Sequence, residues 1–344
     1  MMRYKLLGRS GLRVSELCLG AMSFGTEWGS GADKAESRKV FDRFIEAGGN
    51  FIDTANRYTE GTSEKFLGEF MGSERDKFVV ATKYSLYTKK GDLNDAGNSR
   101  KNMFRSVEGS LKRLGTDYVD ILYLHMWDFT TPVDEVLRGL DDLIRMGKVT
   151  YIAISDSPAW VVSAAQVMAE LKGWSQFIAL QAEYNLIKRD AERDLLPMCE
   201  QFDITCTSWA PIAGGVLSGK YLKDPGAEGR IKPVSQRRND RSNSITEKVV
   251  AIANELGVSA TQVAMNWHRQ NRYRIIPVIG ARKEAQIVDS LGCLNFDIPA
   301  DKLALLDEIT KIEPGFPHDM LAGPQATELL YGGMFDRLDN HRRS

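Results

Sequence analysis

Short apolar runs alternate with longer amphipathic segments along most of this 344-residue chain. The runs are rich in β-branched and aromatic residues and lack strict polar alternation, which is typical of strands covered on both faces. Eight runs are therefore candidate strands of a parallel sheet: residues 16–19, 51–53, 78–82, 121–125, 151–155, 178–181, 205–209 and 275–279.

The segments between these runs predict helices. Residues 35–47 are amphipathic and end at the pair Gly48 and Gly49. Ser99 is a good N-cap for a helix that ends before Gly115. The predicted helices are 35–47, 99–114, 132–146, 158–171, 194–202, 245–256 and 283–291. Strands and helices in this order need crossover connections, and eight such strands close a (β/α)8 TIM barrel.

Three segments lie outside this alternation. Residues 4–14 predict a β-hairpin, because two short strands flank a turn that contains Gly8 and Gly11. Residues 214–244, after the seventh strand, are rich in Gly, Pro, Arg and Asn, and loops of this length are usually functional or disordered. Residues 313–344 show weak periodicity and suit a surface extension, a lid over the barrel mouth or a contact with another subunit.

We expect one domain over residues 1–344. Its parts are the hairpin in 1–15, the barrel in 16–312 and a C-terminal extension in 313–344.

Composition and charge describe a globular protein without a charge bias. Apolar residues make up 43% and charged residues 26%, which suits a protein with a substantial core. The formal charge is 45 − 46 = −1, so we expect neither nucleic acid nor an anionic membrane as a partner. No run of about 18 apolar residues predicts a membrane span. The N-terminus lacks the continuous apolar core of a signal peptide.

The cysteines Cys18, Cys199, Cys206 and Cys293 are scattered without CxxC spacing. This pattern argues against a zinc site and against a disulfide framework. Each cysteine is expected to be a small buried hydrophobic residue. The pattern also suits a reducing compartment, so we expect a cytoplasmic protein without a bound metal.

Candidate chemistry gathers at the ends of neighbouring candidate strands. Asp53, Lys83 and His125 close the second, third and fourth strands, and Tyr58 lies five positions after Asp53. In a (β/α)8 barrel the C-terminal strand ends meet at one mouth. We therefore expect these four side chains to lie together.

A phenol, an ammonium, a carboxylate and an imidazole suit the protonation of a carbonyl oxygen while hydride arrives at its carbon. A phenol with an ordinary pKa of about 10 is a weak acid at neutral pH. A nearby Lys83 ammonium lowers the pKa of Tyr58 by favouring the phenolate, and Asp53 holds that ammonium in place. His125 orients the carbonyl oxygen. Each residue alone has an ordinary structural role, and it is the ordered set that predicts a reductase.

The chain resembles the aldo-keto reductases from the hairpin to about residue 312. The resemblance is carried by residues 19–25, 51–58, 81–83, 122–125, 154–156, 180–185, 208–221 and 277–282. The Asp-Thr-Ala-x-x-Tyr element that begins at Asp53 and the Trp-x-Pro element at Trp209 are jointly specific. The resemblance implies a barrel that reduces aldehydes or ketones with NADPH. It also implies Tyr58 as general acid in a tetrad with Asp53, Lys83 and His125.

The resemblance further implies a site for NADP(H), although no GxGxxG fingerprint follows a candidate strand. Trp209 would stack on one face of the nicotinamide and leave the other open, or else serve as a core aromatic residue. Arg282, at the start of a helix, is the candidate for the 2′-phosphate that distinguishes NADP from NAD. Arg282 and Lys220 have the alternative of being solvated surface cations.

The cofactor positions fall into four groups. Gly20, Ala21, Met22 and Asp53 lie by the nicotinamide ribose, and Ser155, Asp156 and Gln181 lie by the carboxamide. The positions expected between the nicotinamide ring and the pyrophosphate are Trp209, Ala210, Pro211, Ile212, Ala213, Gly214, Lys220 and Arg230. The positions expected at the adenosine phosphate end are Gly280, Ala281, Arg282, Gln286, Asp289 and Ser290.

Three positions depart from the family pattern. Asp156 stands where the family usually has Asn, and a carboxylate only accepts hydrogen bonds. We hypothesise that its charge favours NADP⁺ over NADPH. Ser290 stands where Asn is common, and its shorter side chain weakens an adenine contact. Ala281 stands where many members have Ser or Thr, so recognition of the 2′-phosphate depends on Arg282.

The sequence does not specify the substrate. Trp28, Tyr84, Trp127 and Phe129 either form an apolar wall at the mouth or pack the loops themselves. An aromatic rim admits aryl aldehydes, sugar-derived carbonyls, steroids or polycyclic ketones. A small-molecule carbonyl compound is thus the expected partner of a monomer or homo-oligomer.

Three classes of function remain. The first is an NADPH-dependent carbonyl reductase that binds its cofactor before the carbonyl compound. The second is a regulatory or scaffold barrel that binds the cofactor without turnover, and the complete tetrad argues against it. The third is a metal-dependent isomerase or hydrolase. The absence of an HxH pair, with histidines only at 125, 268, 318 and 341, argues against it.

Overall fold

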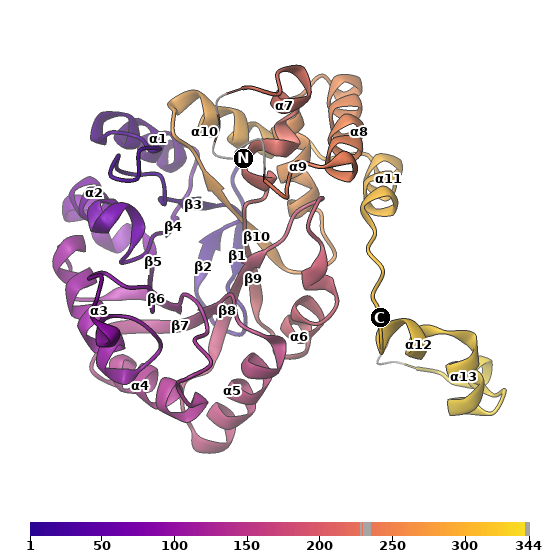
Figure 1. Cartoon of the computed structure of the whole chain (residues 1–344), viewed down its shortest axis with the longest axis horizontal. Coiled ribbons are helices and arrows are strands. Elements are labelled where there is room, and N and C mark those ends of the chain that lie inside the picture. The colour runs from indigo at the N-terminus through magenta and orange to yellow at the C-terminus, as the bar shows by residue number, and fades with distance from the viewer. Residues whose placement is uncertain (228, 230–234, 341–344) are drawn as a thin grey trace. The chain divides into compact units, whose positions relative to one another are not determined.

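Eight parallel strands close on themselves in the computed structural model, which describes residues 1–227, 229 and 235–340. Figure 1 shows these strands as a central ring with the helices outside. Each strand pairs with the next in chain order, and β10 pairs with β3 to complete the ring. The strands are β3 (Cys18–Gly20), β4 (Phe51–Asp53), β5 (Val79–Tyr84), β6 (Val119–Leu124), β7 (Val149–Ser155), β8 (Phe177–Glu183), β9 (Thr205–Trp209) and β10 (Ile275–Gly280). The predicted (β/α)8 TIM barrel is confirmed.

Helices connect the strands and cover their outer faces. They are α1 (Lys34–Glu46), α2 (Thr62–Met71), α3 (Arg100–Leu114), α4 (Val133–Arg145), α5 (Ala159–Lys172), α6 (Leu195–Gln201), α8 (Asp240–Leu256), α9 (Ala260–Arg269), α10 (Glu284–Leu291) and α11 (Ala300–Thr310). All seven predicted helices are present, and the Ser99 side chain accepts the predicted capping hydrogen bond, from the backbone of Asn102.

Of the helices just named, three were not predicted: α2, α9 and α11. In α9, eight of ten residues are buried, and they include the polar residues Thr261, Asn266 and His268. In α2, the interior Gly68 weakens the helical signal. The structure explains that glycine, because a Cβ there would lie 2.4 Å from the backbone oxygen of Leu114.

The long segment after β9 contains more regular structure than the sequence suggested. It holds the 3-10 helix η5 (Ala213–Ser218) and the short helix α7 (Lys220–Lys223), and its last residues belong to α8. The first barrel strand also begins two residues later than expected. Its backbone pairing begins at Cys18, and the side chain of the preceding Glu16 accepts hydrogen bonds from the Arg3 backbone and from Arg269.

The N-terminal hairpin is formed by β1 (Tyr4–Leu6) and β2 (Arg13–Ser15). Leu7 and Val14 belong to the same buried cluster as the inward side chains of the barrel strands. The backbone N–H of Gly8 donates to Thr205 Oγ1 over 2.7 Å. A Cβ at Gly8 would lie 2.2 Å from the carbonyl oxygen of Ile178. The hairpin therefore closes the N-terminal end of the barrel, opposite the strand ends that carry the candidate chemistry.

The chain divides into two compact units, Met1–Thr310 and Lys311–Ser344. The first contains the hairpin and the whole barrel. The second contains α12 (His318–Ala322), α13 (Pro324–Tyr331) and η7 (Phe335–Arg337), and none of these three elements has a buried residue. That all 344 residues form one domain stays a prediction. None of the helices in the described part of the chain is long and apolar enough to cross a membrane.

Candidate active site

Lys83 lies at the centre of the predicted tetrad. Its side chain points into the barrel from β5 and is completely buried. The ammonium lies 2.6 Å from both carboxylate oxygens of Asp53, at the end of β4, and 2.9 Å from the carbonyl oxygen of Thr54. It also lies 3.2 Å from the hydroxyl of Tyr58, the first residue of η1 (Tyr58–Gly61). Three of the four predicted residues are thus joined by direct contacts.

The strand pattern explains why these side chains converge. Phe51 and Val79 belong to the inner cluster, and Asp53 and Lys83 lie two and four residues further along the same strands. Because side chains alternate between the faces of a strand, all four point into the barrel. Thr54 was not predicted, since a backbone acceptor leaves no signal in the sequence.

Electrostatics keeps Lys83 charged. Burial by itself lowers the pKa of Lys83, but the charge and hydrogen bond of Asp53, with a smaller contribution from Tyr58, outweigh it and raise that pKa above its ordinary value. The ammonium also lies 4.8 Å from the centre of the Tyr58 ring. A fixed positive charge this close to the phenol favours its phenolate form.

His125 follows β6 by one residue and completes the group. Its ring packs edge to face against Tyr58, with 5.7 Å between ring centres. The residue is buried, and Nδ1 has no hydrogen-bond partner among the described residues. Burial lowers the pKa of His125 well below its ordinary value, and the charge of Lys83 adds to this effect. The imidazole is therefore neutral near pH 7 and can donate one hydrogen bond.

Gln181 supports the tetrad from β8. Its amide nitrogen donates to Asp53 over 3.0 Å, and both side chains are buried. The resemblance assigned Gln181 to the carboxamide of the cofactor, together with Ser155. In the structure Ser155 pairs in register with Gln181 and is buried beside it. Gln181 thus orients the carboxylate that holds Lys83.

Trp209 ends β9 and is partly buried. Its indole N–H donates to Asp156 over 3.0 Å, and the guanidinium of Arg237 lies 5.5 Å from its ring centre. Arg237 is held in turn by an ion pair of 2.7 Å with Glu183. Burial raises the pKa of Asp156 above its usual value, although the indole hydrogen bond opposes the change. Arg237 and Glu183 were not predicted, because their spacing in the sequence gives no sign that they meet.

The backbone after β9 turns tightly. Ala213 and Gly214 are left-handed, with φ of 50° and 68°. The backbone N–H of Ala213 donates to the carbonyl of Ala210 over 2.7 Å, and that of Gly215 donates to the carbonyl of Ile212 over 2.9 Å. Lys220 begins α7, and its ammonium lies 4.8 Å from the ring centre of Tyr221. Arg230 lies outside the described residues.

The segment after β10 carries the predicted cation Arg282. The backbone N–H of Arg282 donates to Gln286, and the guanidinium has no ion pair with any described residue. Asp289 accepts a hydrogen bond from Gln262, and Ser290 is buried. Gln286 and Asp289 are therefore already engaged within the protein, whereas Arg282 and the neighbouring Lys283 carry the charge that suits a phosphate.

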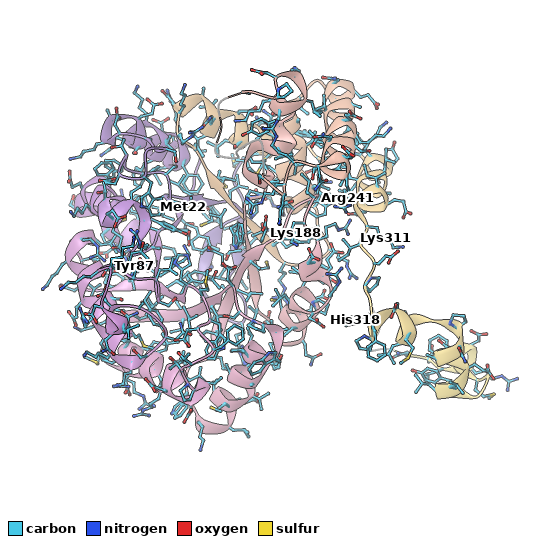
Figure 2. The ribbon with its side chains drawn as sticks, viewed as in Figure 1. Met22, Tyr87, Lys188, Arg241, Lys311 and His318 are labelled. Atoms are coloured by element: carbon cyan, nitrogen blue, oxygen red, sulfur yellow. The ribbon has the colours of Figure 1, made fainter. Side chains whose placement is uncertain are left out.

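The end of β3 is tightly packed. A Cβ at Gly20 would lie 2.8 Å from a methyl carbon of Val278, so this glycine is required by close packing. The carbonyl of Ala21 accepts a hydrogen bond from Ser63, and Met22 lies two residues past the strand end (Figure 2).

The four aromatic residues predicted at the mouth have different environments. Tyr84 is completely buried and donates a hydrogen bond to the backbone of Asn98. Tyr84 thus packs in the main core cluster and leaves no surface exposed at the mouth. Trp127 is also buried in the main core cluster, whereas Trp28 (39% exposed) and Phe129 (70% exposed) remain accessible.

A cavity of about 420 Å³ lies at the mouth end of the barrel. It is lined by Phe129, Asp156, Ser157, Pro158, Leu180, Ala182, Glu183, Asp190, Ala191, Leu195 and Trp209. A second cavity of about 390 Å³ lies against the hairpin and is lined by Arg3, Tyr4, Lys5, Glu16, Arg269, Gln270 and Asp297. Only the first contains predicted site residues.

Comparisons with known proteins agree with this architecture. The model of the aldo/keto reductase family matches residues 16–311. An NADP⁺-dependent aryl-alcohol dehydrogenase of Phanerodontia chrysosporium is 38% identical over 90% of this chain and 86% of its own. A norsolorinic acid reductase of Aspergillus flavus is 37% identical over 92% and 83%, and an aldo-keto reductase of Emericella nidulans is 35% identical over 92% and 84%. The chain belongs to the aldo/keto reductase family.

Proposed function

We propose that this protein reduces an aldehyde or ketone to an alcohol with NADPH, and that Tyr58 is the general acid. The observation that carries the proposal is the Lys83 ammonium, held by Asp53 at 2.6 Å and placed 3.2 Å from the Tyr58 hydroxyl. A relative named for NADP⁺-dependent aryl-alcohol oxidation supports the cofactor and the chemical class.

Proton transfer is the main task of the tetrad. Bound NADPH supplies a hydride to the carbonyl carbon, so the oxygen must gain one proton for the alcohol to form. Tyr58 gives that proton, and the fixed charge of Lys83 stabilises the resulting phenolate without solvent reorganisation. Asp53 and Gln181 hold Lys83 in place through hydrogen bonds of 2.6 and 3.0 Å.

His125 has an orienting role. Because its ring is neutral and packs against the phenol, it can donate a hydrogen bond to the carbonyl oxygen without competing as an acid. The reaction is reversible, since the Tyr58 phenolate accepts the hydroxyl proton when an alcohol is oxidised.

The cofactor contacts extend the proposal along the mouth. Trp209 would support one face of the nicotinamide, and the segment from Ala210 to Gly214 with Lys220 would lie against the pyrophosphate. Arg282 binds the 2′-phosphate, which favours NADP over NAD. Ser155 and Asp156 lie beside the carboxamide.

An aromatic carbonyl compound is the substrate class we propose. Trp28 and Phe129 leave exposed aromatic surface at the mouth, and aromatic rings stack favourably on each other. The name of the Phanerodontia relative also refers to aryl alcohols. We place the protein in the reducing cytoplasm, which suits its four buried free cysteines.

The proposal is tested with Tyr58→Phe. Loss of NADPH absorbance is followed with 4-nitrobenzaldehyde and a panel of other aldehydes and ketones, and is repeated with NADH. We expect Tyr58→Phe to lower kcat by at least about 100-fold, the usual contribution of a general acid, while NADPH still binds. Tyr4→Phe, a change far from the mouth, is the control. Near-normal turnover by Tyr58→Phe would show that the general acid is another group.

A further inference from the structure

Arg57 connects two aromatic side chains at the rim beside Tyr58. Its guanidinium lies 5.6 Å from the ring centre of Trp28 and 4.5 Å from that of Tyr87. It also donates a hydrogen bond of 3.1 Å to the Tyr87 hydroxyl. Trp28 comes from the loop after β3 and Tyr87 from the loop after β5, where Figure 2 labels it. Arg57 thus ties two separate loops to the segment that carries Tyr58.

Glu60 contacts both Arg57 and Trp28 and holds them together. Its carboxylate pairs with Arg57 and accepts a hydrogen bond of 3.1 Å from the Trp28 indole. Glu60 and Thr59 both have left-handed backbones, with φ of 56° and 46°, which residues with side chains rarely adopt. Conformations of this kind persist only where surrounding contacts impose them, and they gather at functional sites.

The same contacts place Trp28 against Tyr58. The two rings meet edge to face, with 6.3 Å between centres and 82° between planes. Trp28 is 39% exposed, so part of the indole remains available at the mouth. Trp28 therefore offers aromatic surface next to the Tyr58 ring.

Resting on the proposed function, we propose that Arg57 is a positioning residue that selects aromatic carbonyl substrates by holding Trp28 and Tyr87 as a rigid wall beside Tyr58. The alternative is that the contact of Arg57 with Trp28 and Tyr87 only stabilises the folded protein and has no effect on substrate selection. Such a contact exists elsewhere: Arg100 lies 4.6 Å from the ring centre of Phe104 and pairs with Asp142 at 2.6 Å, on α3 outside the barrel.

The test compares Arg57→Met with Arg100→Met, because each variant loses one guanidinium stacked on an aromatic ring and paired with a carboxylate. KM and kcat are measured for 2-naphthaldehyde and for propanal. For Arg57→Met we expect KM for 2-naphthaldehyde to rise about five- to tenfold, since two exposed stacking contacts are lost. We expect kcat to change less than about twofold and KM for propanal to stay constant. Arg57→Lys, which keeps the charge but not the planar group, should fall between Arg57→Met and the wild type.

A second measurement does not need turnover. Emission from Trp28 is obtained by subtracting the spectrum of Trp28→Phe, and its quenching by acrylamide should increase in Arg57→Met but not in Arg100→Met. Binding of 2-naphthaldehyde to the NADP⁺-saturated protein is followed through the same emission, and should weaken by the same five- to tenfold factor in Arg57→Met.

The outcomes separate the two proposals. If the wild type oxidises no NADPH with either aldehyde, the proposed function fails, and the binding titration still decides the role of Arg57. If Arg57→Met changes neither KM nor the exposure of Trp28, or raises both KM values equally, the role of Arg57 in selecting aromatic substrates is wrong.

Discussion

Lys83 satisfies its buried charge with four contacts of 3.2 Å or less, two to Asp53 and one each to Thr54 and Tyr58. Removing one member of such a pair leaves the other charge buried without a partner. We expect Lys83→Met to lower the free energy of unfolding by about 3–5 kcal/mol, as measured by urea denaturation. The double variant Asp53→Asn/Lys83→Met should recover part of this loss. A stability loss below about 1 kcal/mol would contradict the pairing.

The pH dependence of this pair follows from the same geometry. Because folding raises the pKa of Lys83, the Lys83 ammonium stabilises the folded protein. This contribution is fully present below the pKa of an unfolded lysine, about 10.4. It is lost as the pH rises through the folded pKa. The Lys83–Asp53 ion pair should therefore add no pH dependence to stability between pH 6 and 9.

Asp156 carries a negative charge at a position where the family usually has a neutral Asn. Its carboxylate accepts from Trp209, the proposed nicotinamide support. We expect Asp156→Asn to weaken NADP⁺ relative to NADPH by up to about fivefold, since a partly exposed charge contributes at most about 1 kcal/mol. Fluorescence titration with each cofactor form measures this ratio. Asp190→Asn, in the same cavity but paired with Lys188, is the control. Equal effects of Asp156→Asn on both forms would refute the hypothesis.

At the residue scale, the place of a site side chain could be predicted from the sequence where that side chain lies on a strand. Asp53 and Lys83 lie in phase with the inward residues of β4 and β5, so the alternation of a strand directs them to one place. Arg57 and Glu60 flank Tyr58 but were not predicted as functional. Their contacts depend on left-handed backbone turns and on a loop from another strand, which no local pattern encodes.

At the element scale, the stabilising effect of a helix cap can be tested with a single substitution. The Ser259 hydroxyl caps α9 by accepting from the backbone of Gln262 over 3.1 Å. We expect Ser259→Ala to lower the free energy of unfolding by about 1 kcal/mol while kcat and KM stay constant. Ser259→Thr should keep most of the stability. Urea denaturation measures both, and an unchanged midpoint for Ser259→Ala would show that the cap contributes nothing.

An apolar pattern predicted most of the elements but did not mark every buried face. The barrel strands stood out as apolar runs, and α4 has a clear apolar face formed by Val136, Leu137 and Leu140. The helix α9 packs against α8, β10 and α10, and its buried residues include the polar Thr261, Asn266 and His268. Where polar residues are buried, apolar positions alone do not outline the buried face of a helix.

At the scale of the whole molecule, the barrel is complete without the second unit. All residues of the three buried clusters lie at or before Leu306, and partly buried residues packed against them end at Ile309. Exposed apolar side chains are instead frequent in the second unit, where Phe316, Leu329 and Leu330 are all more than 60% exposed. A segment of this size cannot bury enough surface to fold alone.

We therefore expect removal of residues 314–344 to change the free energy of unfolding of the barrel by less than about 1 kcal/mol. Removal of residues 300–344 should be far more destabilising, because it deletes α11, the fully buried Leu306 and the hydrogen bond of 2.9 Å from Trp267 to Asp307. Thermal unfolding of both truncated proteins gives this comparison, and a large loss from the shorter truncation would mean that the tail packs on the barrel. Kinetics and light scattering on the protein that lacks residues 314–344 then distinguish the two other expected roles of this extension, a lid over the barrel mouth and a contact with another subunit. A raised KM with constant mass indicates a lid, and a lower mass with constant stability of the barrel indicates a contact between subunits.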